Sequence, residues 1–188
     1  MATKYVVASL PRSGTRSLNR MAALVGLAQK HVSYSWRTDF QDFDLFSDTP
    51  FFAPSVLEEL AAFRGVDVRF IYIERTPEEW FSSFERVGLA ATFRHLCVTD
   101  DQHLHPGQQF DKRYYTDALG PDPLDASSGV VAYRAHRARV FDIARTHNRP
   151  LFSYSFSMGW APLCRFLGVP TPDVAIPHLN RTSMFDAI

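Results

Sequence analysis

Apolar runs alternate with segments of helical periodicity along this chain. Runs rich in β-branched and aromatic residues predict strands at residues 4–10 and 68–74, a short strand at 30–34 and a last one in "RPLFSYS". The run at 68–74, "VRFIYIE", is almost continuously apolar. Such a run is typical of a strand that is buried on both faces of a parallel sheet.

Five segments carry apolar side chains at helical spacing. They are residues 15–27, "PSVLEELAAFRG", "TPEEWFSSFERV", residues 130–146 and "GWAPLCRFLG". We expect Thr76 to cap the third of these helices, with Pro77 in its first turn, and Gly65 and Gly168 to end two others. The alternation predicts an α/β fold, a parallel β-sheet flanked by helices in three layers. The length of 188 residues suits a single domain, residues 1–188.

Two segments lack this periodicity and are predicted to be mostly loop. Residues 37–54 are polar and aromatic and are interrupted by two prolines. Residues 92–129 contain "DDQHLHPGQQ" and "GPDPLDASSG", which are rich in turn formers, and connections of this length are usually functional or mobile. We expect this second segment to be a loop insertion that covers a substrate, with Phe93, Tyr114 and Tyr115 as apolar contacts.

Charge, cysteine content and the length of the apolar runs indicate which partners and which cellular location to expect. The 20 basic and 20 acidic side chains cancel, which disfavours a general nucleic-acid or membrane-surface binder, so anion recognition must be local. Two cysteines are too few for a disulfide framework, and no apolar run approaches the roughly 18 residues of a membrane span. The N-terminus lacks the pattern of a secretory signal. We therefore expect a soluble, cytoplasmic protein.

The first predicted strand runs into "VASLPRSGTRSL", which has the features of an anion site. Ligands of open parallel sheets bind beyond the carboxyl ends of strands. Gly14 lets the backbone approach a ligand, and the free N–H groups of the following helix favour negative charge. Ser13, Thr15 and Ser17 add hydroxyl donors. Arg12 adds a full positive charge. The alternative is an ordinary tight turn between a strand and a helix.

A second constellation lies in "FIYIERTPEEWFSSF". Arg75 ends the clearest strand and Ser83 lies about two helical turns later, so the two could hold one phosphate from two sides. The plain alternative is that Arg75 pairs with Glu78 or Glu79 and that Ser83 is an exposed helix residue. The chain has no Gly-Lys dipeptide, which the loop G-x-x-x-x-G-K-[ST] of nucleoside triphosphatases requires, so a metal-dependent ATP enzyme is disfavoured.

Both stretches together resemble the sulfotransferase family that uses 3′-phosphoadenosine 5′-phosphosulfate (PAPS). "PRSGTRSL" is similar to its 5′-phosphosulfate loop, P-[KR]-[ST]-G-T-x-x-L, and "RTPEEWFSSF" to its 3′-phosphate motif. Trp80, "FSDTPFFAPSVLEEL" and "GWAPLCRFLGVPTPDVAIPHLNRT" resemble a short branch of the family. The resemblance covers most of the chain except residues 92–129, and it implies a sulfotransferase fold related to that of P-loop NTPases.

The resemblance implies roles for individual residues. The first loop would wrap the 5′-phosphosulfate, the second motif would hold the 3′-phosphate, and a tail residue could reach the nucleotide. In that order the implied residues are Arg12, Ser13, Gly14, Thr15, Arg16 and Ser17, then Arg75 and Ser83, then Arg181. Arg12 stands where the best-studied cytosolic members have Lys. Arg16 is either solvent-facing or an extra phosphate contact.

Sulfuryl transfer to a hydroxyl requires a carboxylate or imidazole that can take the proton. Asp48 is the first candidate, because it lies two residues before Pro50, where the cytosolic members carry a His two residues before a Pro. His31 is the second candidate. The alternatives are that Asp48 only caps the turn at Thr49 and that His31 is structural. Arg12 and the helix-start amides suit the charge of the leaving phosphate.

The leading hypothesis is therefore a PAPS-dependent sulfotransferase with a small-molecule acceptor and without a metal. The alternatives are a small P-loop kinase of a nucleoside or sugar, and a non-catalytic nucleotide-binding protein. The cluster of His95, His103 and His105 with Asp100 and Asp101 fits no standard metal spacing. The acceptor and the oligomeric state are left open by the sequence.

Overall fold

A five-stranded parallel sheet forms the centre of the computed structural model, which describes residues 2–177 and residue 179. The strands lie in the order β2-β3-β1-β4-β5. Their bounds are β1 Thr3–Val7, β2 Gln29–Lys30, β3 Leu45–Ser47, β4 Asp67–Ile73 and β5 Leu151–Tyr154. The central strand β1 pairs with β3 and β4, so that Val6 lies between Phe46 and Phe70.

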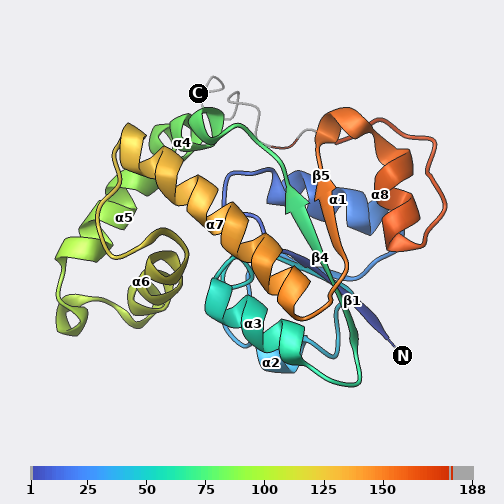
Figure 1. Cartoon of the computed structure of the whole chain (residues 1–188), viewed down its shortest axis with the longest axis horizontal. Coiled ribbons are helices and arrows are strands. Elements are labelled where there is room, and N and C mark those ends of the chain that lie inside the picture. Colours follow the sequence, from blue (N-terminus) through green and yellow to red (C-terminus); the bar gives the residue numbers. More distant parts are fainter. Residues whose placement is uncertain (1, 178, 180–188) are drawn as a thin grey trace.

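Helices cover both faces of this sheet (Figure 1). On one face lie α1 (Thr15–Leu24) and α8 (Trp160–Leu167). On the other lie α2 (Trp36–Asp39), α3 (Pro54–Ala62) and α7 (Ala126–Thr146). The helices α4 (Pro77–Arg86) and α6 (Pro106–Leu119) pack against α7, and α5 (Leu89–Val98) packs against α4 and α6. The predicted three-layer α/β architecture is thus confirmed.

The side chains of β4 show how the sequence builds the two layers. Phe70 and Tyr72 point into the core under α3 and α7, whereas Ile71 and Ile73 point into the core under α1 and α8. All four are almost fully buried, which accounts for the continuous apolar run in this strand. No helix among the described residues combines the length and the apolar character that a membrane span needs.

The helix boundaries of α4 and α8 follow the expected signals, whereas α3 ends at Ala62 and not at Gly65. Thr76 caps α4, since its hydroxyl accepts a hydrogen bond from the backbone N–H of Glu79 at 3.3 Å. Pro77 occupies the first turn of that helix. Gly168, with a φ of 70°, ends α8.

Of the two segments predicted to be mostly loop, residues 37–54 are indeed mostly turns and bends, whereas the prediction for residues 92–129 is wrong. Residues 37–54 contain β3, a three-residue strand that pairs directly with β1. Residues 92–129 are mainly helical: they include most of α5, a 3-10 turn at Asp101–His103, all of α6 and the start of α7. Pro106, taken as a sign of loop, lies in the first turn of α6, where a missing N–H is no disadvantage.

Candidate functional site

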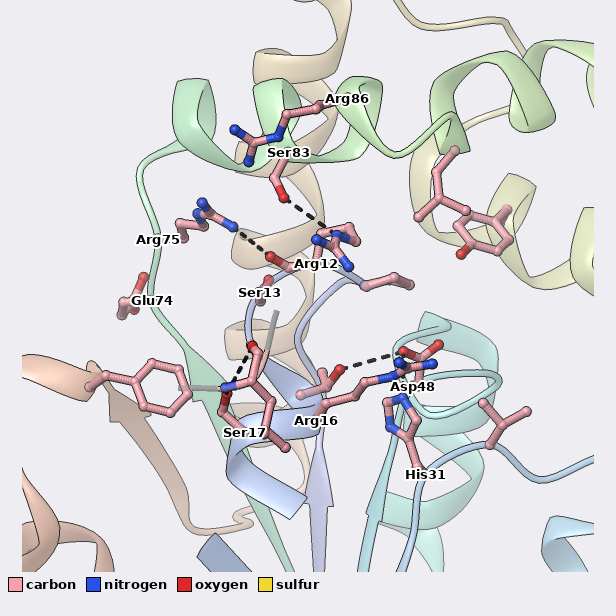
Figure 2. Close-up of a pocket in the computed structure, with 18 residues that line it drawn as sticks. Arg12, Ser13, Arg16, Ser17, His31, Asp48, Glu74, Arg75, Ser83 and Arg86 are labelled. Atoms are coloured by element: carbon pink, nitrogen blue, oxygen red, sulfur yellow. Dashed lines mark hydrogen bonds and ion pairs between the residues drawn. The ribbon is translucent and has the colours of Figure 1, made fainter. Parts of the chain in front are cut away.

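A cleft of about 520 Å³ opens beyond the carboxyl ends of the strands (Figure 2). After β1 the chain moves to one side of the sheet through α1, and β4 is added on the other side, so the cleft lies where the direction of winding changes. Every predicted site residue within the described part of the chain lines it: Arg12, Ser13, Gly14, Thr15, Arg16, Ser17, His31, Asp48, Arg75 and Ser83. Arg181 lies outside the described residues.

The loop between β1 and α1 is shaped to approach a ligand closely. Gly14 has a φ of 109°, and a Cβ at this position would lie 2.6 Å from the ring of Phe156. Only glycine fits both constraints. Arg12 also has a positive φ, of 73°, which is uncommon for a residue with a side chain.

At the start of α1, the first backbone N–H groups and the hydroxyl of Ser13 lack side-chain partners within the described residues. No side chain caps the helix, and no acidic residue lies in its first turn. The hydroxyl of Ser13 is buried and makes no hydrogen bond there. Buried polar groups are normally hydrogen-bonded, and uncapped helix starts favour negative charge. The residues present therefore fit an anion such as a phosphate.

The two sequence motifs are hydrogen-bonded to each other. The indole N–H of Trp80 donates to the carbonyl oxygen of Pro11 at 2.8 Å, and Nη1 of Arg75 donates to the carbonyl oxygen of Arg12 at 2.7 Å. Nε of Arg12 in turn donates to the hydroxyl of Ser83 at 3.4 Å. The loop after β1 is thus held in place by residues of α4 and the segment before it.

The plain alternative for the second motif does not hold. Arg75 forms no ion pair with Glu78 or Glu79 among the described residues, and Glu78 instead pairs with Arg134 at 3.5 Å. Ser83 is 1% exposed rather than solvent-facing. Both side chains therefore belong to the wall of the cleft.

Four arginines line the cleft: Figure 2 shows Arg12, Arg75 and Arg86 near Ser83, and Arg16 beside Asp48 and His31. Burial lowers the pKa of Arg12, and the charges of Arg75, Arg16 and Arg86 lower it further. None of these four arginines forms an ion pair within the described part of the chain. Such a cluster favours a ligand with several negative charges.

Two members of this arrangement escaped the sequence reasoning. Arg86 lies three residues after Ser83 on α4, and this spacing places both on one face of the helix. Glu74 also lines the cleft, but its carboxylate is bound by Arg137 at 2.7 Å and so does not neutralise the arginine cluster. The helical spacing could have revealed Arg86, whereas the partner of Glu74 lies far away in the sequence.

The two carboxylate oxygens of Asp48 contact different groups. Oδ1 accepts a hydrogen bond from the backbone N–H of Thr49 at 2.9 Å, as the turn-capping alternative proposed. Oδ2 accepts one from the hydroxyl of Thr15 at 3.5 Å and lies 3.6 Å from Nε2 of His31. The carboxylate thus caps the turn and also faces the start of α1.

The two ring nitrogens of His31 have different surroundings. Nδ1 lies 3.0 Å from the hydroxyl of Ser47, which donates its own proton to Oδ1 of Asn19 at 2.8 Å. Asn19 is in turn hydrogen-bonded to Gln29 at 2.8 Å. Nδ1 of His31 is therefore engaged by Ser47, and Nε2 is the ring nitrogen that faces Asp48. Burial lowers the pKa of His31, and the charge of Asp48 opposes this effect.

The tail of the chain returns to the cleft at Leu179. The backbone N–H of Leu179 donates to the hydroxyl of Ser17 at 2.9 Å. The same hydroxyl donates to the carbonyl oxygen of Leu179 at 3.3 Å. The side chain of Ser17 is therefore engaged by the tail in this structure.

The described residues contain no group of three or more His, Cys, Asp or Glu side chains that could hold a metal ion.

Many α/β proteins that bind phosphorylated ligands do so beyond the strand ends of a parallel sheet, at the start of a helix. The sulfotransferase domain family matches residues 28–185, and the chain belongs to this family. The matched range begins after the loop that follows β1.

A fungal relative shows weaker similarity. Over 146 residues the chain is 28% identical to "Ava biosynthesis cluster protein M" of Aspergillus versicolor. The alignment covers 73% of this chain and 54% of the relative, so the chain spans about half the length of that protein.

Proposed function

We propose that this protein transfers the sulfuryl group of PAPS to a hydroxyl or amine of a small acceptor and releases adenosine 3′,5′-bisphosphate. The observation that carries the proposal is that two groups of residues suited to binding anions line one cleft. One consists of Ser13 and the start of α1, and the other of Arg75, Ser83 and Arg86. PAPS has phosphate groups at two separate positions, which matches this arrangement.

The residues of the cleft divide between the two ends of the donor. The unpartnered hydroxyl of Ser13 and the first N–H groups of α1 would hold the 5′-phosphosulfate. Arg75, Ser83 and Arg86 would hold the 3′-phosphate, which distinguishes PAPS from ATP. Arg12 belongs to the loop and also contacts Ser83, so its charge can stabilise both the 5′- and the 3′-phosphate of the donor.

The bound donor supplies the sulfuryl group: the acceptor oxygen bonds to sulfur, the bond between sulfur and the bridging phosphate oxygen breaks, and its electron pair stays on the phosphate. Arg12 and the helix-start amides stabilise the charge on that leaving phosphate. The acceptor proton passes to the pair formed by Nε2 of His31 and Oδ2 of Asp48, which lie 3.6 Å apart. In this pair Asp48 stabilises the protonated imidazole.

The proposal is tested by equilibrium binding of nucleotides. Adenosine 3′,5′-bisphosphate should raise the melting temperature well above the value that ATP with magnesium reaches. Equal or better stabilisation by ATP would instead favour the kinase alternative. Incubation with PAPS and a metabolite extract, followed by mass spectrometry for a gain of SO₃, tests the transfer itself. Bisphosphate binding without any such product would favour a non-catalytic nucleotide-binding protein.

Arg75→Ala is expected to abolish the preference for the bisphosphate over AMP. The variant loses a charged contact to the 3′-phosphate, which lowers the affinity for the bisphosphate roughly ten- to a hundredfold. The affinity for AMP should fall less, because AMP loses only the support that Arg75 gives to the loop through the carbonyl oxygen of Arg12. Isothermal titration with both nucleotides measures the ratio. Arg145→Ala, an exposed position near the end of α7, removes the same charge outside the cleft and should keep the preference. An unchanged preference in Arg75→Ala would remove Arg75 from the site.

A further inference from the structure

A smaller cavity of about 190 Å³ adjoins the main cleft. Val32, Leu89 and Tyr115 line both of them, so the two spaces meet. Val32 follows His31 and Thr49 follows Asp48, and both Val32 and Thr49 line the cavity. The cavity therefore opens beside the proton-accepting pair.

The wall of this cavity combines apolar side chains with several polar groups. Phe93 and Leu96 of α5 are buried apolar residues on its wall, and the hydroxyls of Thr49 and Thr92 belong to two further lining residues. None of the lining residues is basic, in contrast to the arginine cluster of the main cleft. The volume lies below the roughly 300–1,000 Å³ of pockets for drug-sized ligands, so a small occupant fits.

Asp111 of α6 gives the cavity its charge. Its carboxylate is half-buried and has neither a hydrogen bond nor an ion pair among residues 2–177 and 179. The neighbouring ammonium of Lys112 is directed elsewhere, to Asp101 at 2.7 Å and to the carbonyl oxygen of Thr99 at 2.8 Å. Burial and the charge of Asp48 raise the pKa of Asp111. A half-buried carboxylate of this kind is stabilised by a cation or a hydrogen-bond donor.

Tyr115 supplies a second unpartnered polar group at the junction of the two spaces. The residue is 9% exposed, and its hydroxyl has no hydrogen-bond partner in the described part of the structure. Burial raises the pKa of Tyr115, so the phenol stays neutral and can both donate and accept a hydrogen bond. A polar group of a ligand at this junction would satisfy it.

We propose that this cavity is the acceptor pocket and that it selects a small molecule with a compact apolar or aromatic body and a protonated amine that faces Asp111. The acceptor hydroxyl then lies at the junction, near Tyr115 and the pair of His31 and Asp48. This proposal rests on the proposed sulfotransferase function for its reacting group, but the preference for an amine depends only on the cavity. Acceptors with a carboxylate are disfavoured by Asp111 and Asp48.

Three phenols that differ in charge test the proposal. Tyramine carries an ammonium group, 4-ethylphenol is neutral and 4-hydroxyphenylacetate is anionic. Isothermal titration, with and without adenosine 3′,5′-bisphosphate, should show tyramine bound about tenfold more tightly than 4-ethylphenol and 4-hydroxyphenylacetate bound most weakly. Asp111→Asn should bring tyramine and 4-ethylphenol within about threefold of each other. Asp122→Asn, an exposed position before α7, makes the same charge change outside the cavity and should keep the preference.

The outcomes separate this inference from the proposed function. Equal binding of the three phenols, binding of none of them, or a preference for tyramine that survives in Asp111→Asn would overturn the amine pocket. Failure of the bisphosphate to bind, with the preference for tyramine intact in titrations without nucleotide, would instead count against the sulfotransferase proposal alone. Melting temperatures of both variants near that of the parent protein establish that they fold.

Discussion

The pair of Asp48 and His31 shows how single side chains combine a structural and a chemical task. One carboxylate oxygen of Asp48 holds the turn through Thr49, while the other faces His31. One ring nitrogen of His31 is held by Ser47, which leaves the other available in the cleft. Each group is oriented by one atom and is able to accept a proton with another, an arrangement common in general-base pairs.

The pH dependence of sulfuryl transfer follows from this pair. Because the pKa of His31 lies below its ordinary 6.5, the imidazole is neutral at pH 7, and the rate should fall only as the pH drops below 6.5. Asp48 raises the pKa of His31, so Asp48→Asn should move this acidic limb to lower pH and reduce the plateau rate about a hundredfold. Single-turnover rates between about pH 5 and pH 8 measure both effects.

Matched variants complete the pH experiment. His31→Gln should remove the acidic limb, and Asp42→Asn, at an exposed position, should leave the profile unchanged. In Asp48→Asn the amide oxygen of the new side chain could still accept from the backbone N–H of Thr49, so the turn should survive and the melting temperature should change little. If Asp48→Asn and His31→Gln both transferred at the parent rate, the proton-accepting pair would be assigned wrongly.

At the scale of elements, α4 determines the position of the loop after β1. Trp80→Phe removes the only N–H that reaches the Pro11 carbonyl in the described structure, and an unsatisfied buried carbonyl costs about 1–3 kcal/mol of stability. The affinity for adenosine 3′,5′-bisphosphate should fall as well, since the loop loses one of its two supports from this segment. Thermal unfolding and titration calorimetry measure the two effects.

Trp160→Phe is the matched control for that variant. Trp160 lies on the opposite face of the sheet, and its indole N–H donates to the carbonyl oxygen of Val174 at 2.7 Å. This variant should also lose stability but keep the affinity for the bisphosphate. An equal loss of affinity in both variants would show that general destabilisation, and not the loop, is responsible.

The sequence was informative where an element had a long, uniform pattern. The apolar run of β4 and the capping signals of α4 led to correct boundaries, and the two motifs led to residues that the fold brings together. The short strand β3 escaped because three residues in an aromatic, proline-containing segment carry no periodicity. Helices α5 and α6 escaped because turn formers between them were taken to extend through them.

At the scale of the whole molecule, the distribution of charge matters more for ligand binding than the net charge does. The net charge is zero, yet four arginines without ion pairs in the described chain line one cleft. Binding of adenosine 3′,5′-bisphosphate should therefore weaken about tenfold as sodium chloride rises from roughly 50 to 500 mM, because salt screens partly exposed charges. Binding of uncharged adenosine should stay nearly constant. Titrations over this range measure both slopes.

Arg86→Ala should reduce the salt dependence of bisphosphate binding, because it removes one exposed charge from the cleft wall. Arg145→Ala should leave the slope as it is in the parent protein. A bisphosphate affinity that does not change with salt would mean that the arginine cluster contributes little to binding.

The hydrogen bonds from Trp80 and Arg75 to the loop carbonyls have a consequence for protein engineering. The phosphate loop is a short sequence, and transplanting it into another parallel-sheet scaffold is a natural design. Its backbone, with a positive φ at Arg12 and at Gly14, is however braced by side chains that arrive some sixty residues later. A graft would have to carry the loop and α4 together as a two-part cassette, because the loop alone brings its sequence without the supports that hold its shape.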